Sequence, residues 1–212
     1  PEAPKTAIDF KHPKPGIYYA AKEDVNQSGI LMVDLGITRD NPDYYAVQVM
    51  NQVLGGGLAS RLFNNIRSKK GLAYAVFGSV GAAFDHPGVL QMGMTTKSQT
   101  TAASIDALRE EADNIVKNPA TDDEMKRAKD AILNSFVFEF DSKDKILRER
   151  MAYEFYGYPA DFLERYRAGI EKVTAADVAR VAQKYVHKDQ LAVLVVGKAA
   201  DFEKPLASFG PV

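Results

Sequence analysis

Cysteine is absent from this chain of 212 residues, and histidine occurs only three times. Without cysteine there is no disulfide, no thiolate nucleophile and no cysteine ligand for a metal. The histidines are His12, His86 and His187, and none lies in a predicted helix with a second metal ligand three or four residues away. We therefore expect no zinc site and no bound cofactor made by this chain alone.

Net charge is also nearly absent, because 27 Lys and Arg residues against 28 Asp and Glu give −1 at pH 7. Such a balance argues against a large basic surface for nucleic acid or anionic membranes. The longest uninterrupted apolar run covers residues 191–196 and is far too short to span a bilayer. We expect a soluble globular protein that binds no nucleic acid and has no membrane span.

Several motifs of catalytic sites are missing or have a simpler explanation. The serines are scattered, and no G-x-S-x-G motif of a nucleophile elbow occurs. The three glycines at 55–57 lack the Lys-Ser/Thr of a phosphate loop and are interpreted as a helix stop. The carboxylates of Glu110-Glu111 and residues 122–124 lie on predicted helix faces or first turns, where solvation and the helix dipole explain them.

Hydrophobic periodicity and turn signals predict an α+β fold. Strands are predicted at residues 17–21, 29–37, 74–83, 89–96 and 191–196. Helices are predicted at residues 42–54, 100–116, 121–140, 146–155, 160–170 and 174–185. Because strands adjacent in sequence form hairpins and the helices are grouped together, we expect a mixed, largely antiparallel sheet with helices packed on it. Proline-rich residues 1–15 are interpreted as a linker or extended N-terminal arm, and residues 16–212 as a single α+β domain.

Two of these elements carry more detailed expectations. The second strand alternates Leu31, Val33, Leu35 and Ile37 on one face. Asn41-Pro42-Asp43 predicts a helix start with a cap, a proline at the first helical position and an acid in the first turn.

Residues 55–77 carry the candidate site. After the glycines, apolar residues recur at helical spacing from Leu58 to Ile66, a basic turn follows, and residues 72–77 are predicted as strand. Arg67 and Tyr74 lie at this helix-to-strand junction, where a guanidinium and a phenol suit recognition of a peptide carbonyl or carboxylate, or of a developing oxyanion. From the residues alone, a cation at a helix C-terminus and a strand aromatic are the favoured explanations.

Further motifs extend over nearly the whole chain. They are residues 54–63 (LGGGLASRLF), residues 66–74 (IRSKKGLAY), Asp43-Tyr44, residues 156–159 (YGYP), residues 173–178 (VTAADV) and residues 193–197 (VLVVG). On these motifs the chain resembles the insulinase/pitrilysin family of zinc metallopeptidases, and most of all its bacterial branch related to mitochondrial processing peptidase.

This resemblance implies a fold and a role. Family members are built from two similar domains, of which the first carries zinc in an H-x-x-E-H motif and the second closes a chamber and carries an Arg/Tyr pair. The present sequence has no H-x-x-E-H, and the interval from Arg67 to Tyr74 matches that of the pair. The chain is thus expected to be the C-terminal, non-zinc half, in which Arg67 binds the substrate backbone and Tyr74 binds substrate and assists the oxyanion.

The resemblance also implies partners. We expect a zinc-bearing N-terminal half or partner subunit, tethered or separate, a peptide substrate, and a possible homo- or heterodimer in the bacterial cytoplasm or periplasm. The chain alone is expected to be inactive. The alternative is a non-catalytic structural or partner subunit of the same family, and a weaker one is a peptide-binding module that adds a strand at a hairpin edge.

Overall fold

The computed structural model describes residues 8–136 and 141–212. One sheet of six strands has the order β1-β6-β2-β5-β4-β3. The strands are β1 (Gly16–Ala21), β2 (Gln27–Leu35), β3 (Ile37–Thr38), β4 (Ala75–Ala83), β5 (Pro87–Lys97) and β6 (Ala192–Gly197). β2 pairs antiparallel with β5 and β6, and β4 with β5, whereas β1 lies parallel to β6 and β3 parallel to β4. The predicted α+β fold with a mixed, largely antiparallel sheet is confirmed.

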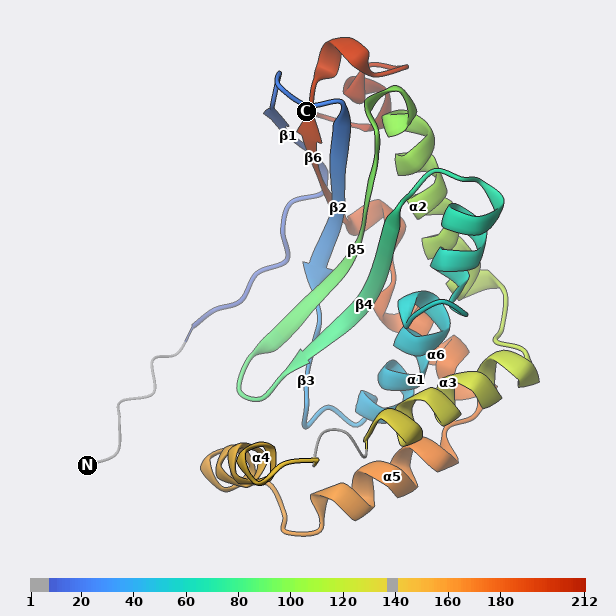
Figure 1. The fold of residues 1–212 in the computed structure, drawn as a ribbon. Helices are drawn as coiled ribbons and strands as arrows, with labels where there is room; N and C mark the ends of the chain where they lie inside the picture. The colour runs from blue at the N-terminus through green and yellow to red at the C-terminus, as the bar shows by residue number, and fades with distance from the viewer. Residues whose placement is uncertain (1–7, 137–140) are drawn as a thin grey trace.

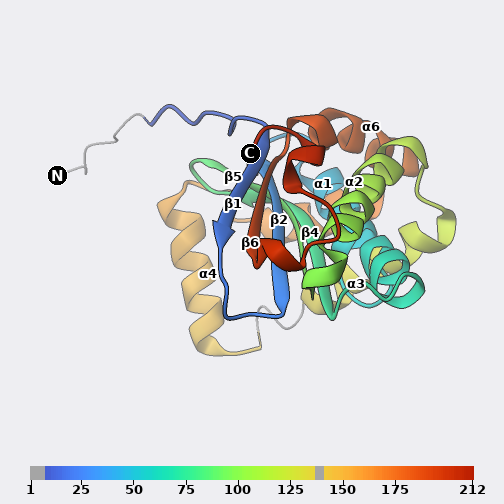
Figure 2. The same ribbon diagram turned by 90° about the horizontal axis from the view of Figure 1, so that it is seen from above.

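The helices form a layer on one side of this sheet, with one exception. They are α1 (Tyr44–Gly55), α2 (Thr101–Lys117), α3 (Asp122–Phe136), α4 (Lys143–Phe155), α5 (Phe162–Lys172) and α6 (Ala175–Tyr185). Figure 2 shows α1, α2, α3 and α6 together on one side of the strands. Helix α4 lies apart from this layer, beyond the tip of the β4–β5 hairpin (Figure 1), and none of its side chains is buried.

The core lies between the sheet and α1 and α2. Helix α1 packs against β4, α3, α5 and α6, and α2 packs against β2, β5 and α6. The side chains of Val47 and Met50 from α1 are fully buried, as are Met32 of β2 and Ile105 of α2. The core thus joins the N-terminal strands to the C-terminal α6 and β6.

The second strand differs from its prediction. It ends at Leu35, and Ile37 belongs to the short β3. The face turned to the helices carries Ile30 and Met32, which are buried, while Leu31, Val33 and Leu35 are only partly buried on the opposite face. The alternation of apolar residues could not decide between the faces, because apolar residues occupy both.

The start of α1 also differs in detail. The helix begins at Tyr44, so Pro42 precedes the cap position and no acid lies in the first turn. Asn41 is not the cap residue either, because the cap position is Asp43 and no side chain caps it. The Asn41 Oδ1 accepts a hydrogen bond of 2.9 Å from the backbone N–H of Asp43, in a turn just before the helix. The Asp43 carboxylate is instead bound by α6, through Arg180 and Lys184.

Two predicted segments reach beyond the described residues. Of the arm expected at 1–15, residues 1–7 lie outside them, and residues 8–15 carry no helix or strand. The arm's His12 contacts Asp34 of β2, with Nδ1 2.6 Å from Oδ1. Of the helix predicted to 140, α3 is described to Phe136, and residues 137–140 lie outside. The boundary at residue 16 stays a prediction.

Candidate functional site

The three glycines end α1, as the sequence predicts. A Cβ on Gly55 would lie 2.4 Å from both the backbone N and the O of Gly78, so only glycine lets the end of α1 pack this closely on β4. One turn earlier, the Asn51 amide donates to Val80 O at 3.0 Å and accepts from Val80 N at 2.8 Å. These contacts cover the outer edge of β4 at Gly78 and Val80. Strand addition at this hairpin edge is therefore not supported.

The segment after the glycines is a π-helix, η1 (Phe63–Lys69), rather than an α-helical turn. Leu62 and Ile66 are fully buried, as their spacing predicts, but Leu58 is 74% exposed and lies outside the packed face. Lys70 N donates to Asn65 O at 3.1 Å, the i→i+5 bond of the wider helix. Single π turns inside helical segments are frequent at functional sites.

The structure brings Arg67 and Tyr74 together. The guanidinium carbon of Arg67 lies 4.6 Å from the centroid of the Phe63 ring and 5.6 Å from that of the Tyr74 ring. Contacts of this kind at exposed sites contribute about 0.5–1 kcal/mol each. Tyr74 is 85% exposed and precedes β4, so the strand predicted from residue 72 begins only at Ala75.

The donors of this pair are available to a ligand. Within the described part of the chain, neither the Arg67 guanidinium nor the Tyr74 hydroxyl has a hydrogen bond or ion pair. A free guanidinium donates to a carbonyl or carboxylate, and a free phenol donates to an oxyanion. The arrangement can therefore bind peptide groups from solvent, whereas neither side chain has a neighbouring base.

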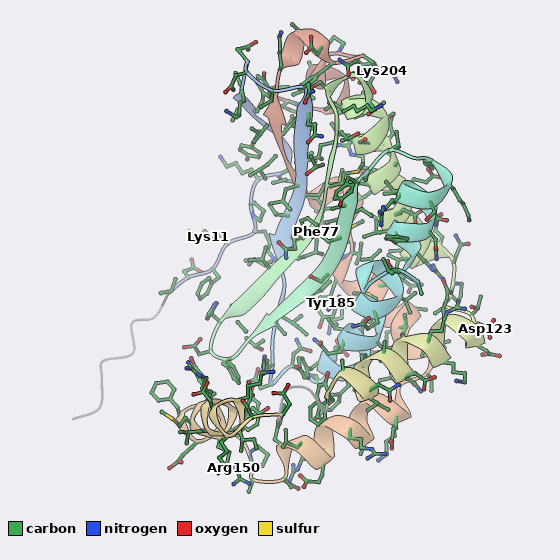
Figure 3. All side chains as sticks on the ribbon, viewed as in Figure 1. Lys11, Phe77, Asp123, Arg150, Tyr185 and Lys204 are labelled. Carbon is green, nitrogen blue, oxygen red and sulfur yellow. The ribbon has the colours of Figure 1, made fainter. Side chains whose placement is uncertain are left out.

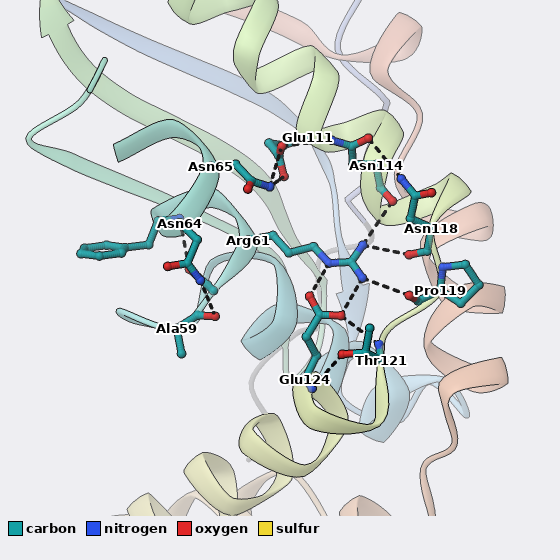
Figure 4. A network of polar contacts seen from close by, with 12 residues as sticks. Ala59, Arg61, Asn64, Asn65, Glu111, Asn114, Asn118, Pro119, Thr121 and Glu124 are labelled. Atoms are coloured by element: carbon teal, nitrogen blue, oxygen red, sulfur yellow. Dashed lines mark hydrogen bonds and ion pairs between the residues drawn. The ribbon is translucent and has the colours of Figure 1, made fainter. Parts of the chain in front are cut away.

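A second arginine of this stretch has the opposite environment. Arg61 donates from Nε and Nη2 to the two oxygens of Glu124, both at 2.8 Å (Figure 4). The remaining donors reach the carbonyl oxygens of Asn114 at 3.2 Å, Asn118 at 2.8 Å and Pro119 at 3.1 Å. The Arg61 bond lowers the pKa of the Glu124 carboxyl, against its burial, which raises it. Arg61 is structural, and the sequence carries no signal that separates it from Arg67.

Glu111 corrects another expectation. Its side chain is only 2% exposed, so solvation does not explain it. The Asn65 amide of η1 donates to Glu111 at 3.0 Å, as does the Asn114 amide of α2. Its neighbour Glu110 is exposed as predicted and pairs with Lys70. Helical periodicity places Glu111 on the buried face of α2, but the amide partner from η1 comes from a distant part of the chain.

The residues present do not fit a zinc site. His12 and His86 each contact a single carboxylate, from Asp34 and Asp85, and His187 contacts the Lys184 carbonyl oxygen. Across residues 8–136 and 141–212, no group of three or more histidine, aspartate or glutamate side chains could hold a metal ion. In the same residues no helix has both the length and the apolar character of a membrane-crossing segment.

Comparison with known proteins finds a matching family model and several relatives. A family model described as "Peptidase M16 inactive domain" matches residues 1–132. An uncharacterized zinc protease of Streptomyces coelicolor is 28% identical over 157 residues, which cover 74% of this chain and 34% of that protein. A Helicobacter pylori protein named as a non-peptidase homolog is 25% identical over 150 residues, 70% of this chain and 34% of its own.

The fold has a close match among solved structures. The peptidase M16 inactive domain from Pseudomonas fluorescens superposes with a TM-score of 0.86 at 26% sequence identity, covering 96% of this chain and 48% of that one. The present chain thus spans about half the length of this structure and a third of the two relatives.

Proposed function

Because the chain belongs to the peptidase M16 inactive-domain family, we propose that it is the substrate-binding half of a zinc-dependent endopeptidase. In this proposal it closes the chamber over the substrate and supplies Arg67 and Tyr74. The zinc and the general base come from another domain or subunit. The observation that carries the proposal is the stacked, solvent-facing Arg67–Tyr74 pair, whose polar donors have no partner among the described residues.

The chemistry follows from what the two donors are. The Arg67 guanidinium offers several N–H groups to a peptide carbonyl oxygen, and so holds the substrate backbone. The Tyr74 hydroxyl donates one hydrogen bond, which strengthens as negative charge develops on the carbonyl oxygen. Stacking on Phe63 and Tyr74 restricts the guanidinium before substrate arrives, which reduces the entropy cost of binding.

The partner half requires a contact surface, and α4 is the candidate. Leu147, Met151 and Phe155 recur every four residues on this helix and are 58%, 60% and 80% exposed. An apolar stripe of this kind is typical of a surface covered by another domain. The relatives are longer than this chain by about one further domain of this size, so we assign the stripe to the zinc-bearing half.

The test uses the assembled two-half protein. Tyr74→Phe should lower kcat by about 10²–10³-fold with little change in KM, because an oxyanion donor acts mainly in the transition state. Arg67→Ala should raise KM, because it removes a group that binds the substrate backbone. Tyr18→Phe, which alters another exposed tyrosine on β1, is the matched control. Unchanged kcat/KM in both site variants would remove the pair from the mechanism.

A non-catalytic partner subunit is the second candidate. The name of the Helicobacter pylori relative favours it, since that protein is called a non-peptidase homolog. The two candidates separate on the zinc-bearing half: an H-x-x-E-H motif in the same gene or its neighbour supports the peptidase, and its absence from both supports the structural role. In either case the purified 212-residue chain should neither bind stoichiometric zinc nor cleave peptides.

A further inference from the structure

The hydrogen bonds of Arg61 join the segment just before η1 to the α2–α3 connection. We propose that Arg61 is a positioning residue that, with Asn65, clamps η1 to the α2–α3 connection and so sets the direction in which Arg67 and Tyr74 face a substrate. The substrate part of this inference rests on the proposed function above. The clamp itself is a property of this chain.

The first part of the clamp is Arg61, whose N–H donors are all used in hydrogen bonds. Arg61 makes five hydrogen bonds, to both oxygens of Glu124 and to three backbone carbonyls, and its side chain is 11% exposed. Asn114 and Asn118 lie at the C-terminal end of α2, where the helix dipole favours a cation. Glu124 is in turn held by Thr121, whose backbone N–H donates to it at 2.9 Å. A lysine has three donors on one atom and cannot reproduce this planar set.

The second part lies one turn further along. The Asn65 amide donates to the buried Glu111 carboxylate of α2. Leu62 and Ile66, on either side of Asn65, are fully buried. Polar bonds and apolar packing therefore fix η1 against the body of the molecule. Arg67, the next residue, is left to stack outward on Phe63 and Tyr74.

The other end of the site is fixed independently. Thr96 of β5 donates from its hydroxyl to Leu72 O at 2.7 Å, and Ser104 of α2 donates to Thr96 at 3.0 Å. This anchor lies just before Tyr74. The Arg61 clamp holds the segment that carries Arg67, and the Thr96 anchor holds the segment that carries Tyr74. Loosening the clamp should therefore displace Arg67 relative to Tyr74.

The π-helical form of η1 sets the angle between the Phe63 and Arg67 side chains. An i→i+5 turn differs from an α turn in residues per turn, and so in the angle between Phe63 and Arg67 about the axis. Arg61 lies before η1 and touches neither ring, so its effect on the pair passes through the backbone.

The test measures the pair directly. In the 212-residue chain labelled with ¹⁵N-arginine, the Arg67 side-chain resonances should carry the ring-current shift of Phe63 and Tyr74. Arg61→Lys should move these resonances toward unstacked values while the chain stays folded. Glu124→Gln, which keeps the side-chain volume, should produce a smaller shift in the same direction. Arg167→Lys, in the exposed Arg167–Glu171 pair of α5, is the control and should leave them unchanged.

Activity provides the second measurement. In the assembled peptidase, Arg61→Lys should lower kcat/KM at least tenfold, and Arg167→Lys should not. If Arg61→Lys leaves both the Arg67 resonances and kcat/KM unchanged while Arg67→Ala lowers kcat/KM, the clamp is wrong and the proposed function stands. If Arg61→Lys moves the resonances but Arg67→Ala and Tyr74→Phe leave kcat/KM unchanged, the clamp stands and the proposed function fails.

Discussion

Arg61 and Arg67 belong to the same short segment, yet Arg61 is saturated with hydrogen bonds and Arg67 has none within residues 8–136 and 141–212. The difference arises because Arg61, just before η1, points to acceptors of α2, α3 and their connection, whereas Arg67, within η1, stacks on the rings of Phe63 and Tyr74. Glu110 and Glu111 are separated in the same way on α2. At the scale of single residues, a charged side chain with hydrogen-bond partners in the protein stabilises the fold. One without such partners keeps its donors available to a ligand.

Asp43 gives a prediction at this scale. Its carboxylate is 6% exposed and accepts hydrogen bonds from Arg180 at 2.6 Å, Lys184 at 2.7 Å and Tyr185 at 2.8 Å. Burial opposes ionisation, but the bonds from Lys184, Arg180 and Tyr185 outweigh it and lower the pKa of Asp43 to about 2. The folded-state pKa thus lies below the unfolded value, so the stabilisation is complete above about pH 4 and is lost as pH falls toward 2.

The measurement is urea unfolding between pH 6 and pH 2. Asp43 should contribute on the order of 1–2 kcal/mol at pH 6, reduced from the full shift because Arg180 and Lys184 are half exposed. Asp43→Asn should lower stability at pH 6 and flatten the loss between pH 4 and pH 2. An acid limb of the same slope in the variant would contradict the assignment.

At the scale of elements, local signals predict helix ends well when the capping residues are adjacent in sequence. Capping boxes form at both Thr121 and Thr174. At α1 the aspartate expected in the first turn is taken by α6 instead. A cap whose partners are adjacent in sequence forms in the folded protein. A carboxylate within reach of a distant helix instead binds the cations of that helix.

The Thr174 box gives the second prediction. Thr174 Oγ1 accepts from Asp177 N at 3.2 Å, and the Asp177 carboxylate accepts from Thr174 N at 3.0 Å. Thr174→Ala should destabilise the protein by about 1 kcal/mol, because two backbone donors at the start of α6 are then less well satisfied. Thermal unfolding should show a Tm lower by about 2–4 °C.

Thr174→Ser is the matched control, since it keeps the hydroxyl and removes only the methyl group. It should retain most of the stability. Equal losses for the serine and alanine variants would assign the effect to the methyl group and not to the cap.

At the scale of the whole molecule, one helix remains outside the layered structure. Arg150 on α4 and Lys204 near the C-terminus lie at opposite ends of the molecule (Figure 3). The other described α-helices contribute buried side chains to the core, whereas α4 contributes none. Its apolar stripe adds no buried side chain to the described core, and in our proposal it contacts the zinc-bearing half.

The third prediction concerns this stripe. The double variant Leu147→Glu and Met151→Glu should weaken association with the zinc-bearing half at least tenfold, because it places two carboxylates in an apolar contact. The Tm of the isolated chain should stay unchanged, since both side chains are exposed and glutamate favours helix. Isothermal titration calorimetry measures the affinity.

A charge-matched control is Lys126→Glu, which changes the net charge by the same two units on α3, in the helix layer. Lys126 pairs with Asp130 at the surface, and an exposed pair of this kind contributes little to stability. An equal loss of affinity in both variants would indicate long-range charge repulsion and would exclude a contact at α4.

The sequence predicted the fold class, the glycine stop and the order of the strands and helices apart from the short β3, because periodicity, caps and turn residues act locally. It also identified Arg67 and Tyr74 as the pair to examine, through their spacing and the family resemblance. Their roles toward a substrate stay a proposal. The sequence could not determine which face of β2 is buried, since both faces are apolar.

How the charges of this stretch divide depends on tertiary packing. Arg61 binds Glu124 of α3 and carbonyl oxygens at the end of α2, and Glu111 of α2 binds Asn65 of η1, between segments far apart in the chain. Arg67 stacks on Phe63 and Tyr74, and Tyr74 is exposed to solvent. Local sequence signals cannot distinguish these arginines, because an ion pair or hydrogen bond with a distant residue depends on how the elements pack.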